Sequence, residues 1–226
     1  ISLGLVGSEM CIRDRAYNAS LKYVLLEIND NKNFVNRKIV IAKDLLEPFK
    51  KDTSIENIKV LNEFLGKDLK GTICSHPFSK MEYNYDIPML EANFVTTEQG
   101  TGIVHCAPSH GPDDFNLCLN NNIKAIETVD GDGKYTNEIK LFEGLHIFKA
   151  NNLIIEKLDE QKNLVTNGKL THSYPHSWRS KAPLVHRATP QWFISMESHG
   201  LRDKALKAID NTDFYPSKGK ERIKSM

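Results

Sequence analysis

The chain has 226 residues, which is enough for one large domain or for one domain and part of a second. Hydrophobic residues make up 40% and charged residues 26%, the balance of a folded globular protein rather than a disordered one. The formal net charge of +1 excludes a strongly basic nucleic-acid binder or an acidic tail, although a local basic patch can still contact RNA.

Residues 1–15, ISLGLVGSEMCIRDR, read unlike the rest of the chain. They do not begin with Met, and their basic residues Arg13 and Arg15 follow the apolar stretch, the reverse of the order in a signal peptide. The string resembles a translated adapter or cloning scar. We therefore set residues 1–15 aside as non-native and expect the chain to be an internal piece of a longer protein.

Neither membrane spans nor disulfides are expected. No apolar run approaches the roughly 18 residues that a membrane span requires. The cysteines contain no Cys-x-x-Cys pair and are scattered, so we expect free thiols in a reducing compartment. They are Cys11, Cys74, Cys106 and Cys118. These features favour a cytoplasmic protein that makes no membrane contact.

The first predicted elements are a hairpin and a helix. The β-branched runs at 22–28 and 37–43 predict two strands that pair across the polar loop 29–36. Asp44 is placed to cap a short helix that Pro48 limits.

More strands are predicted further along the chain. They are expected at 57–66, at 69–78, and on both sides of a glycine-rich turn within 85–107, where Pro88 indicates an edge position. A helix is expected to begin near Pro112, because proline and acidic residues suit the first helical turn. The remaining predictions are a strand at 123–130, a turn at 131–137, and amphipathic helices at 148–161 and 201–212.

A change of sequence character near residue 167 predicts a domain boundary between about 165 and 190. We assign residues 16–170 to one domain, incomplete at its N-terminus, and residues 171–226 to a junction and part of a second domain. Aromatic and basic residues follow the boundary. Trp178 and Trp192 are expected to pack at the junction, and Arg179, Lys181 and Arg187 either contact phosphate or form a solvated face.

The densest motif is GTGIVHCAPSHGPDDF at residues 100–115. Gly100, Thr101 and Gly102 predict a tight turn and do not match a nucleotide-binding fingerprint. His105 follows apolar residues and is expected on a strand, where a lone histidine is most simply a satisfied, half-buried one. His110 and an aspartate pair follow across a loop that ends at a helix N-terminus.

Two chemistries compete for this cluster. A zinc hydrolase could use His105, His110 and an aspartate, but the spacing matches no zinc signature, so we expect no metal site. The alternative is a pocket in which a carboxylate binds an α-ammonium group. Asp113 and Asp114 point about 100° apart on a helix, so at most one of them faces a ligand together with His105. Cys106 and Cys118 are interpreted as small buried hydrophobes.

Four segments, taken together, resemble bacterial-type isoleucyl-tRNA synthetases. The resemblance runs in order over residues 17–226. The valine and leucine synthetases share the Gly-Thr-Gly turn but differ in the residues after it. The segments are GTGIVHCAPSHGPDDF, GLHIFKANNLIIEKL, THSYPHSWRSKAPLVHRATPQWFISM and GKERIKSM.

The resemblance implies an α/β fold: a β-barrel-like editing domain of the class I synthetases up to about residue 170, then a stub of the Rossmann-type catalytic domain. It also implies that Asp114 binds the substrate's α-ammonium group. His105 is expected to lie beside the substrate's amino-acid side chain and to help admit valine and exclude isoleucine. The further residues that we expect to contact substrate are Gly100, Thr101, Gly102 and His110.

The implied parent activity is ATP-dependent aminoacylation of tRNA(Ile) by an enzyme expected to be a monomer, with this region hydrolysing mischarged Val-tRNA(Ile). Its partners are then tRNA(Ile), valine or isoleucine, and the remainder of the synthetase chain. Editing needs no cofactor. ATP and Mg²⁺ serve the parent elsewhere, because the HIGH and KMSKS signatures are absent here.

The threonine-rich peptide of the family should precede Tyr17, where residues 1–15 stand instead, so we expect an incomplete editing site. Two alternatives remain open. One is a non-catalytic tRNA-binding module that uses the basic C-terminal stretch, where residues 201–226 hold seven Lys or Arg against four Asp or Glu. The other is the zinc-dependent hydrolase.

Overall fold

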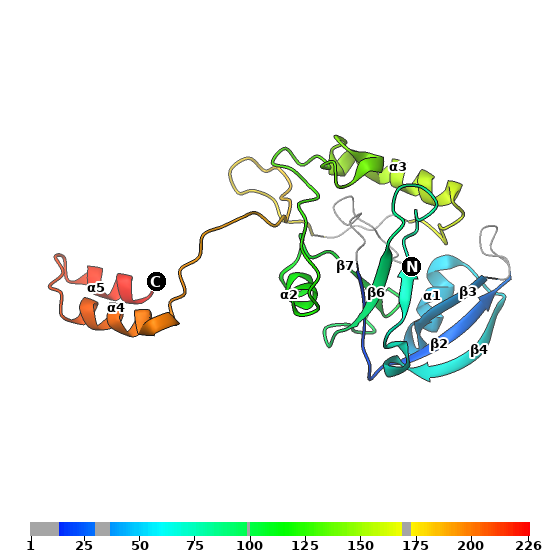
Figure 1. Cartoon of the computed structure of the whole chain (residues 1–226), viewed down its shortest axis with the longest axis horizontal. Helices are drawn as coiled ribbons and strands as arrows, with labels where there is room; N and C mark the ends of the chain where they lie inside the picture. The colour runs from blue at the N-terminus through cyan, green and yellow to red at the C-terminus, as the bar shows by residue number, and fades with distance from the viewer. Residues whose placement is uncertain (1–13, 30–36, 99, 169–172) are drawn as a thin grey trace. The chain divides into compact units, whose positions relative to one another are not determined.

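The computed structural model describes residues 14–29, 37–98, 100–168 and 173–226 (Figure 1). It divides into two compact units, the first ending at Ala188 and the second beginning at Thr189. Residues 173–188, which the sequence analysis assigned to the junction, thus belong to the first unit. The assignment of evolutionary domains stays a prediction.

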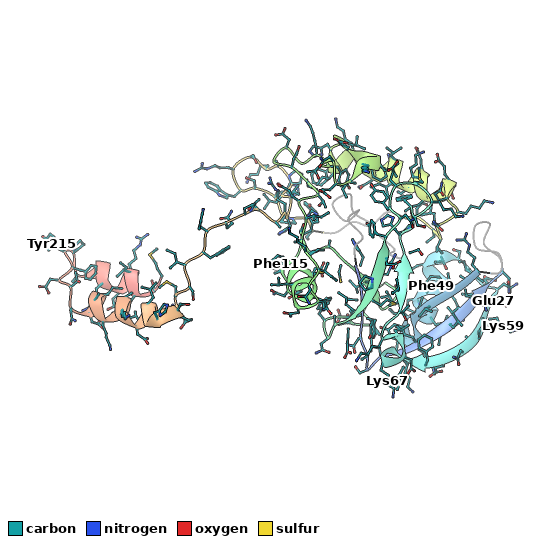
Figure 2. The ribbon with its side chains drawn as sticks, viewed as in Figure 1. Glu27, Phe49, Lys59, Lys67, Phe115 and Tyr215 are labelled. Carbon is teal, nitrogen blue, oxygen red and sulfur yellow. The ribbon has the colours of Figure 1, made fainter. Side chains whose placement is uncertain are left out.

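A three-stranded antiparallel sheet with the order β3-β2-β4 forms one part of the first unit. The predicted hairpin is confirmed, since β2 and β3 pair along their length. The strands are β2 (Lys22–Ile28), β3 (Arg37–Ala42) and β4 (Ile58–Leu65). Helix α1 (Leu46–Thr53) lies against this sheet, and its Phe49, labelled in Figure 2, is 1% exposed among the sheet's aliphatic side chains.

The predicted start and limit of α1 are wrong. A short 3-10 turn, η2 (Lys43–Leu45), precedes the helix, and neither it nor α1 has a side-chain cap from Asp44. Pro48 lies within the first turn of α1, and the helix continues past it to Thr53. First-turn N–H groups have no intrahelical partner, so a proline there removes no hydrogen bond.

A four-stranded mixed sheet has the order β5-β6-β1-β7. Its strands are β1 (Asp14–Tyr17), β5 (Ile73–Ser75), β6 (Asp86–Glu91) and β7 (Ile103–Cys106). Strand β1 runs parallel to β6 and antiparallel to β7. Its first two residues, Asp14 and Arg15, fall within the segment that we set aside as non-native.

The edge position predicted from Pro88 is wrong, because β6 lies between β5 and β1. The ladder to β1 runs from Met89 to Glu91 and so begins one residue after the proline. The N–H that Pro88 lacks is therefore not needed by β1, and the strand can be internal.

Two helices complete the first unit: α2 (Pro112–Asn120) and α3 (Ile147–Glu160). Both were predicted, and Pro112 is the first residue of α2. The α3 helix buries one face in a core cluster whose members include Phe78, Tyr83, Tyr135, Phe142 and Ile154. Two short 3-10 turns, η3 (Gly66–Leu69) and η4 (Lys140–Phe142), link other elements.

The strand predicted at 123–130 is absent from the described structure apart from a single bridge between Val129 and Tyr135. Main-chain hydrogen bonds join Thr128 and Asp130 to residues 134–136, and hydroxyl groups pair two further carbonyls of the segment. Ser109 Oγ donates to the main-chain oxygen of Ile126, and Thr136 Oγ1 donates to that of Glu127. Side chains thus satisfy carbonyl groups that a strand would have paired.

The second unit contains η5 (Ser198–Gly200), the predicted helix α4 (Leu201–Asp210) and a further helix, α5 (Lys218–Lys224). Neither tryptophan packs within its own unit, since Trp178 in the first unit is 76% exposed and Trp192 in the second is fully exposed, and their packing at a junction stays a prediction. The Arg179 guanidinium lies 4.9 Å from the ring centre of Trp178. Within the described ranges, no helix is both long and apolar enough to cross a membrane.

Candidate functional site

The candidate site lies where β7 ends and α2 begins. Residues 107–111 connect the two elements, and Gly111 is the N-cap residue of α2. Cys106 at the end of β7 and Cys118 in α2 are both fully buried, in one cluster with Ala16 of β1. The predicted burial of the two cysteines is confirmed, and their packing fixes α2 against the four-stranded sheet.

The Gly-Thr-Gly turn is held by the three-stranded sheet. Gly100 and Gly102 have φ values of +79° and +73°, a backbone region that favours glycine. The hydroxyl of Tyr23 donates to the main-chain oxygen of Gly102 at 2.7 Å, and the Ala42 amide donates to that of Thr101 at 2.8 Å. The predicted tight turn is confirmed. Contact between these three residues and a substrate stays a prediction.

His105 lies on β7, as predicted, and its side chain is half-buried. Its cross-strand neighbour on β1 is Arg15. Alternation along the strand puts His105 on the opposite face from Cys106, which is packed against α2. The histidine therefore faces away from the cluster that anchors the helix.

Asp114 turns back from α2 onto the loop. Its Oδ2 accepts a hydrogen bond from the Ala107 amide at 2.9 Å. Burial raises the pKa of the Asp114 carboxyl, and the Ala107 hydrogen bond partly opposes that effect. Asp113, one position earlier, is exposed. The helix thus separates the two carboxylates as expected, with only Asp114 directed at the loop.

His110 is held through both ring nitrogens. Its Nδ1 lies 2.5 Å from the main-chain oxygen of His186, which can only accept, so Nδ1 carries a proton. Its Nε2 lies 3.0 Å from Thr128 Oγ1, whose hydroxyl donates to it in the neutral ring. Burial lowers the pKa of His110, which keeps the ring neutral at pH 7.

Sequence reasoning missed the segment that meets this loop, residues 186–188. The Ala188 amide donates to the main-chain oxygen of Ser109 at 2.7 Å, and Arg187 forms an ion pair of 2.7 Å with Glu127. Arg187 was expected to contact phosphate or solvent. No local pattern signals these contacts, because the partners are about 60 to 80 positions apart in the sequence.

Two hollows flank Arg187. One, of about 230 Å³, is lined by residues 108–112, by Phe115 and by residues 186–188; Phe115 is labelled on α2 in Figure 2. The other, of about 470 Å³, is lined by residues 130–133, by His146 and Phe148, and by residues between 182 and 187. Among the residues that the structure describes, no three His, Cys, Asp or Glu side chains gather closely enough to hold a metal ion.

The structure therefore brings Ala107 and His110 of the loop together with Asp114 in the first turn of α2, and it places His105 two residues before Ala107. A hydrogen bond of 2.9 Å from the His110 amide to the Ala107 main-chain oxygen closes the turn between them. The Gly-Thr-Gly turn stands at the other end of β7. This arrangement can present one half-buried carboxylate, a histidine and main-chain amides to a small polar ligand.

Comparison with known proteins gives a consistent result. The protein family described as “Leucyl-tRNA synthetase, editing domain” matches residues 27–166, more than half of the chain. An isoleucine–tRNA ligase from Pelagibacter ubique (strain HTCC1062) is 71% identical over 211 residues, covering 93% of this chain and 23% of the relative. An isoleucine–tRNA ligase from Gluconobacter oxydans (strain 621H) is 41% identical over 230 residues, covering 95% and 24%.

The chain spans about a quarter of the length of these curated relatives. A solved structure described as “The crystal structure of GlLeuRS-CP1” has a TM-score of 0.56 and 13% identity, and the match covers 74% of this chain and 83% of that one. At this identity the likeness concerns the fold alone.

Proposed function

The chain belongs to the family of leucyl-tRNA synthetase editing domains, and on that premise we propose that it is the region of an isoleucine–tRNA ligase that hydrolyses mischarged Val-tRNA(Ile). The substrate assignment is supported by two relatives, both named isoleucine–tRNA ligase, whose matches cover 93% and 95% of this chain. The observation that carries the chemistry is the half-buried Asp114 carboxylate, held over the loop by the Ala107 amide.

The need for such a site is physical. Valine is one methylene smaller than isoleucine, and a hydrophobic pocket discriminates one methylene by only about 1–3 kcal/mol, a limit for which isoleucyl-tRNA synthetase is the usual worked example. A second pocket that admits valine and excludes isoleucine removes the error by hydrolysis.

In this proposal Asp114 binds the α-ammonium group of the valyl ester. Its Oδ2 is held by the Ala107 amide, and we assign Oδ1 to the ammonium group. Burial of the carboxyl, which raises its pKa, also means that water screens the ammonium–carboxylate attraction less than it would at an exposed site. The bound cation in turn stabilises the ionised form of Asp114.

His105 contacts the amino-acid side chain and limits its size. A water molecule then attacks the ester carbonyl, the bond between that carbon and the ribose oxygen breaks, and the departing ribose oxygen takes up a proton from the water to become a hydroxyl, which releases valine and tRNA(Ile). Main-chain amides in residues 100–112 stabilise the oxyanion, and Gly100, Thr101 and Gly102 complete the surroundings of the substrate.

The whole ligase, in this proposal, is a cytoplasmic monomer that uses ATP and Mg²⁺ for aminoacylation at a site outside this segment. Editing itself uses no cofactor. The partners of this region are tRNA(Ile), valine or isoleucine, and the remainder of the ligase chain.

The test is Asp114→Asn in the full-length ligase, with Asp113→Asn as a matched control on the same helical turn. We expect hydrolysis of Val-tRNA(Ile) to fall at least tenfold in the Asp114 variant, while isoleucine aminoacylation and the control variant stay within about twofold of wild type. Undiminished hydrolysis in Asp114→Asn would falsify the assignment.

A second candidate is a non-catalytic tRNA-binding module. The basic excess of residues 201–226 favours it, although Asp210 already pairs with Lys220 and Lys224 in that stretch. Binding of uncharged tRNA(Ile) across a salt series distinguishes the two. A steep salt slope without any hydrolysis supports the module, whereas hydrolysis supports editing.

A further inference from the structure

Three consecutive residues, 186–188, each form a polar contact with a different residue next to the candidate site. The His186 main-chain oxygen accepts from the His110 ring, the Arg187 side chain pairs with Glu127, and the Ala188 amide donates to Ser109. We call these three contacts the 186–188 clamp.

The clamp continues into the site through an unbroken series of hydrogen bonds. The His110 ring bonds His186 at 2.5 Å, the His110 amide donates to the Ala107 oxygen at 2.9 Å, and the Ala107 amide donates to Asp114 Oδ2 at 2.9 Å. Apart from the short Asp114 carboxylate, every group in the series is a main-chain group or a ring nitrogen, so no link depends on a long, flexible side chain.

The loop is also held from its other side. Ser109 is 5% exposed, and its hydroxyl donates to the main-chain oxygen of Ile126. His110 Nε2 meets Thr128, which is 1% exposed. Because hydrogen bonds between buried groups are costly to break without replacement, the clamp and these contacts define one position for the loop.

We propose that His110, Arg187 and the Ala188 amide are positioning groups for the deacylation reaction: through the 186–188 clamp they orient the loop on which the Asp114 carboxylate depends. The inference rests on the proposed function and assigns His110 a task different from substrate contact. The clamp uses the last three residues of the first compact unit, so chain leaving the unit is tied directly to the site.

The decisive variants exploit the two nitrogens of His110. The side chain of an asparagine at this position places its amide nitrogen close to the position of the histidine Nδ1, so a donor to the His186 oxygen is retained. The longer side chain of a glutamine places its amide nitrogen close to the position of Nε2, so only the partner for Thr128 is retained. His110→Asn and His110→Gln therefore differ mainly in the link to the clamp.

Both variants are made in the full-length ligase. The rate at which each preparation hydrolyses Val-tRNA(Ile) is normalised to its rate of isoleucine aminoacylation. We expect kcat for hydrolysis to fall about tenfold in His110→Gln with KM within twofold, as expected for loss of one buried hydrogen bond, and His110→Asn to stay within threefold of wild type. Hydrogen exchange of peptides covering residues 107–112 should accelerate in the glutamine variant only.

A second pair of variants serves if the His110 variants fail to fold. Ala188→Pro removes the N–H that donates to Ser109, and Ala188→Ser retains it. Exchange should accelerate and hydrolysis should fall in the proline variant alone. Equal behaviour of the two members of both pairs overturns the proposal, as does faster exchange without slower hydrolysis.

Failure of the clamp and failure of the proposed function give different results. If wild type hydrolyses Val-tRNA(Ile) and the variants match it, the clamp has no positioning role and the editing function stands. If wild type does not hydrolyse it, the editing function fails and the positioning role fails with it, while the exchange rates still report whether residues 186–188 hold the loop.

Discussion

Asp114 Oδ2 accepts the Ala107 amide across 2.9 Å, so an aspartate in the first turn of α2 closes the loop that precedes its own helix. The same carboxyl is half-buried, and burial raises its pKa. The Asp114 carboxyl therefore fixes the shape of the loop, and its burial disfavours its own ionised form.

Replacing Asp114 by Asn is expected to increase the free energy of unfolding at pH 7. A raised pKa in the folded state means that the folded chain binds the proton more tightly than the unfolded chain. The free energy of unfolding therefore falls as pH rises from the unfolded-state pKa through the higher folded-state pKa. The asparagine oxygen accepts from Ala107 without a charge. Urea titrations at pH 7 and about pH 3 should show the gain shrinking at the lower pH.

Asp113→Asn is the control, because Asp113 is exposed on the same turn and its replacement should change stability by no more than about 0.5 kcal/mol. A gain of equal size in both variants contradicts the role given to burial.

His76 should make the fold sensitive to acid. The residue is 2% exposed, its Nδ1 accepts from the Phe78 amide at 3.0 Å, and burial, with a smaller contribution from the Arg15 charge, lowers its pKa from 6.5 to about 4. The unfolded chain therefore takes up a proton first. The contribution of the neutral His76 ring to the free energy of unfolding is fully present above pH 6.5. It is lost as pH falls towards 4, by about 3 kcal/mol in total.

His76→Asn keeps an acceptor for the Phe78 amide but does not titrate. Urea unfolding between about pH 7 and pH 4.5 should give a flatter stability profile for this variant than for wild type. Parallel profiles for wild type and His76→Asn are the contradicting result.

Gly102→Ala should be much more destabilising than Gly100→Ala. Both positions have positive φ, so both variants carry backbone strain of about 1 kcal/mol or more. A Cβ at Gly102 would additionally lie 2.4 Å from the Cβ of Ala42, while a Cβ at Gly100 meets nothing within 4 Å. Thermal unfolding should place the Gly102 variant at least about 2 kcal/mol below the Gly100 variant, and equal losses rule out the close contact.

Phe49→Ala should cost about 3–5 kcal/mol, because the ring is 1% exposed between α1 and the three-stranded sheet. Phe115→Ala, at a ring that is 41% exposed on α2, should cost less than about 1 kcal/mol. Chemical denaturation of the two variants compares them directly. A small loss at Phe49 is incompatible with its place in the core.

Regular elements with a clear hydrophobic period were predictable from sequence. The hairpin of β2 and β3 and the helix α3 were expected within a few residues, because alternation and a 3.6-residue period each specify one buried face. The resemblance to isoleucyl-tRNA synthetases and the editing-domain fold are confirmed by the family match and by relatives covering 93% and 95% of the chain.

Features that depend on distant partners were not predictable. Pro88 was placed at a sheet edge because its sequence neighbours cannot show that the ladder to β1 starts at Met89. Residues 123–130 have strand-like composition, but hydroxyl groups satisfy the carbonyls of Ile126 and Glu127. In the site, helical geometry separated Asp114 from Asp113 correctly, whereas the contact of His110 with residue 186 has no local signal. The roles of the site residues stay predictions.

The position of β1 in the middle of its sheet sets an order for folding. Its partners β6 and β7 follow it by about 75 and 90 residues, whereas β2, β3 and β4 pair with near neighbours in the chain. Closing a long loop costs entropy before any contact compensates for it. The three-stranded sheet should therefore form first during synthesis. Strand β1 must wait for β6 on one side and for β7 on the other, and β7 emerges just before the loop that Asp114 closes.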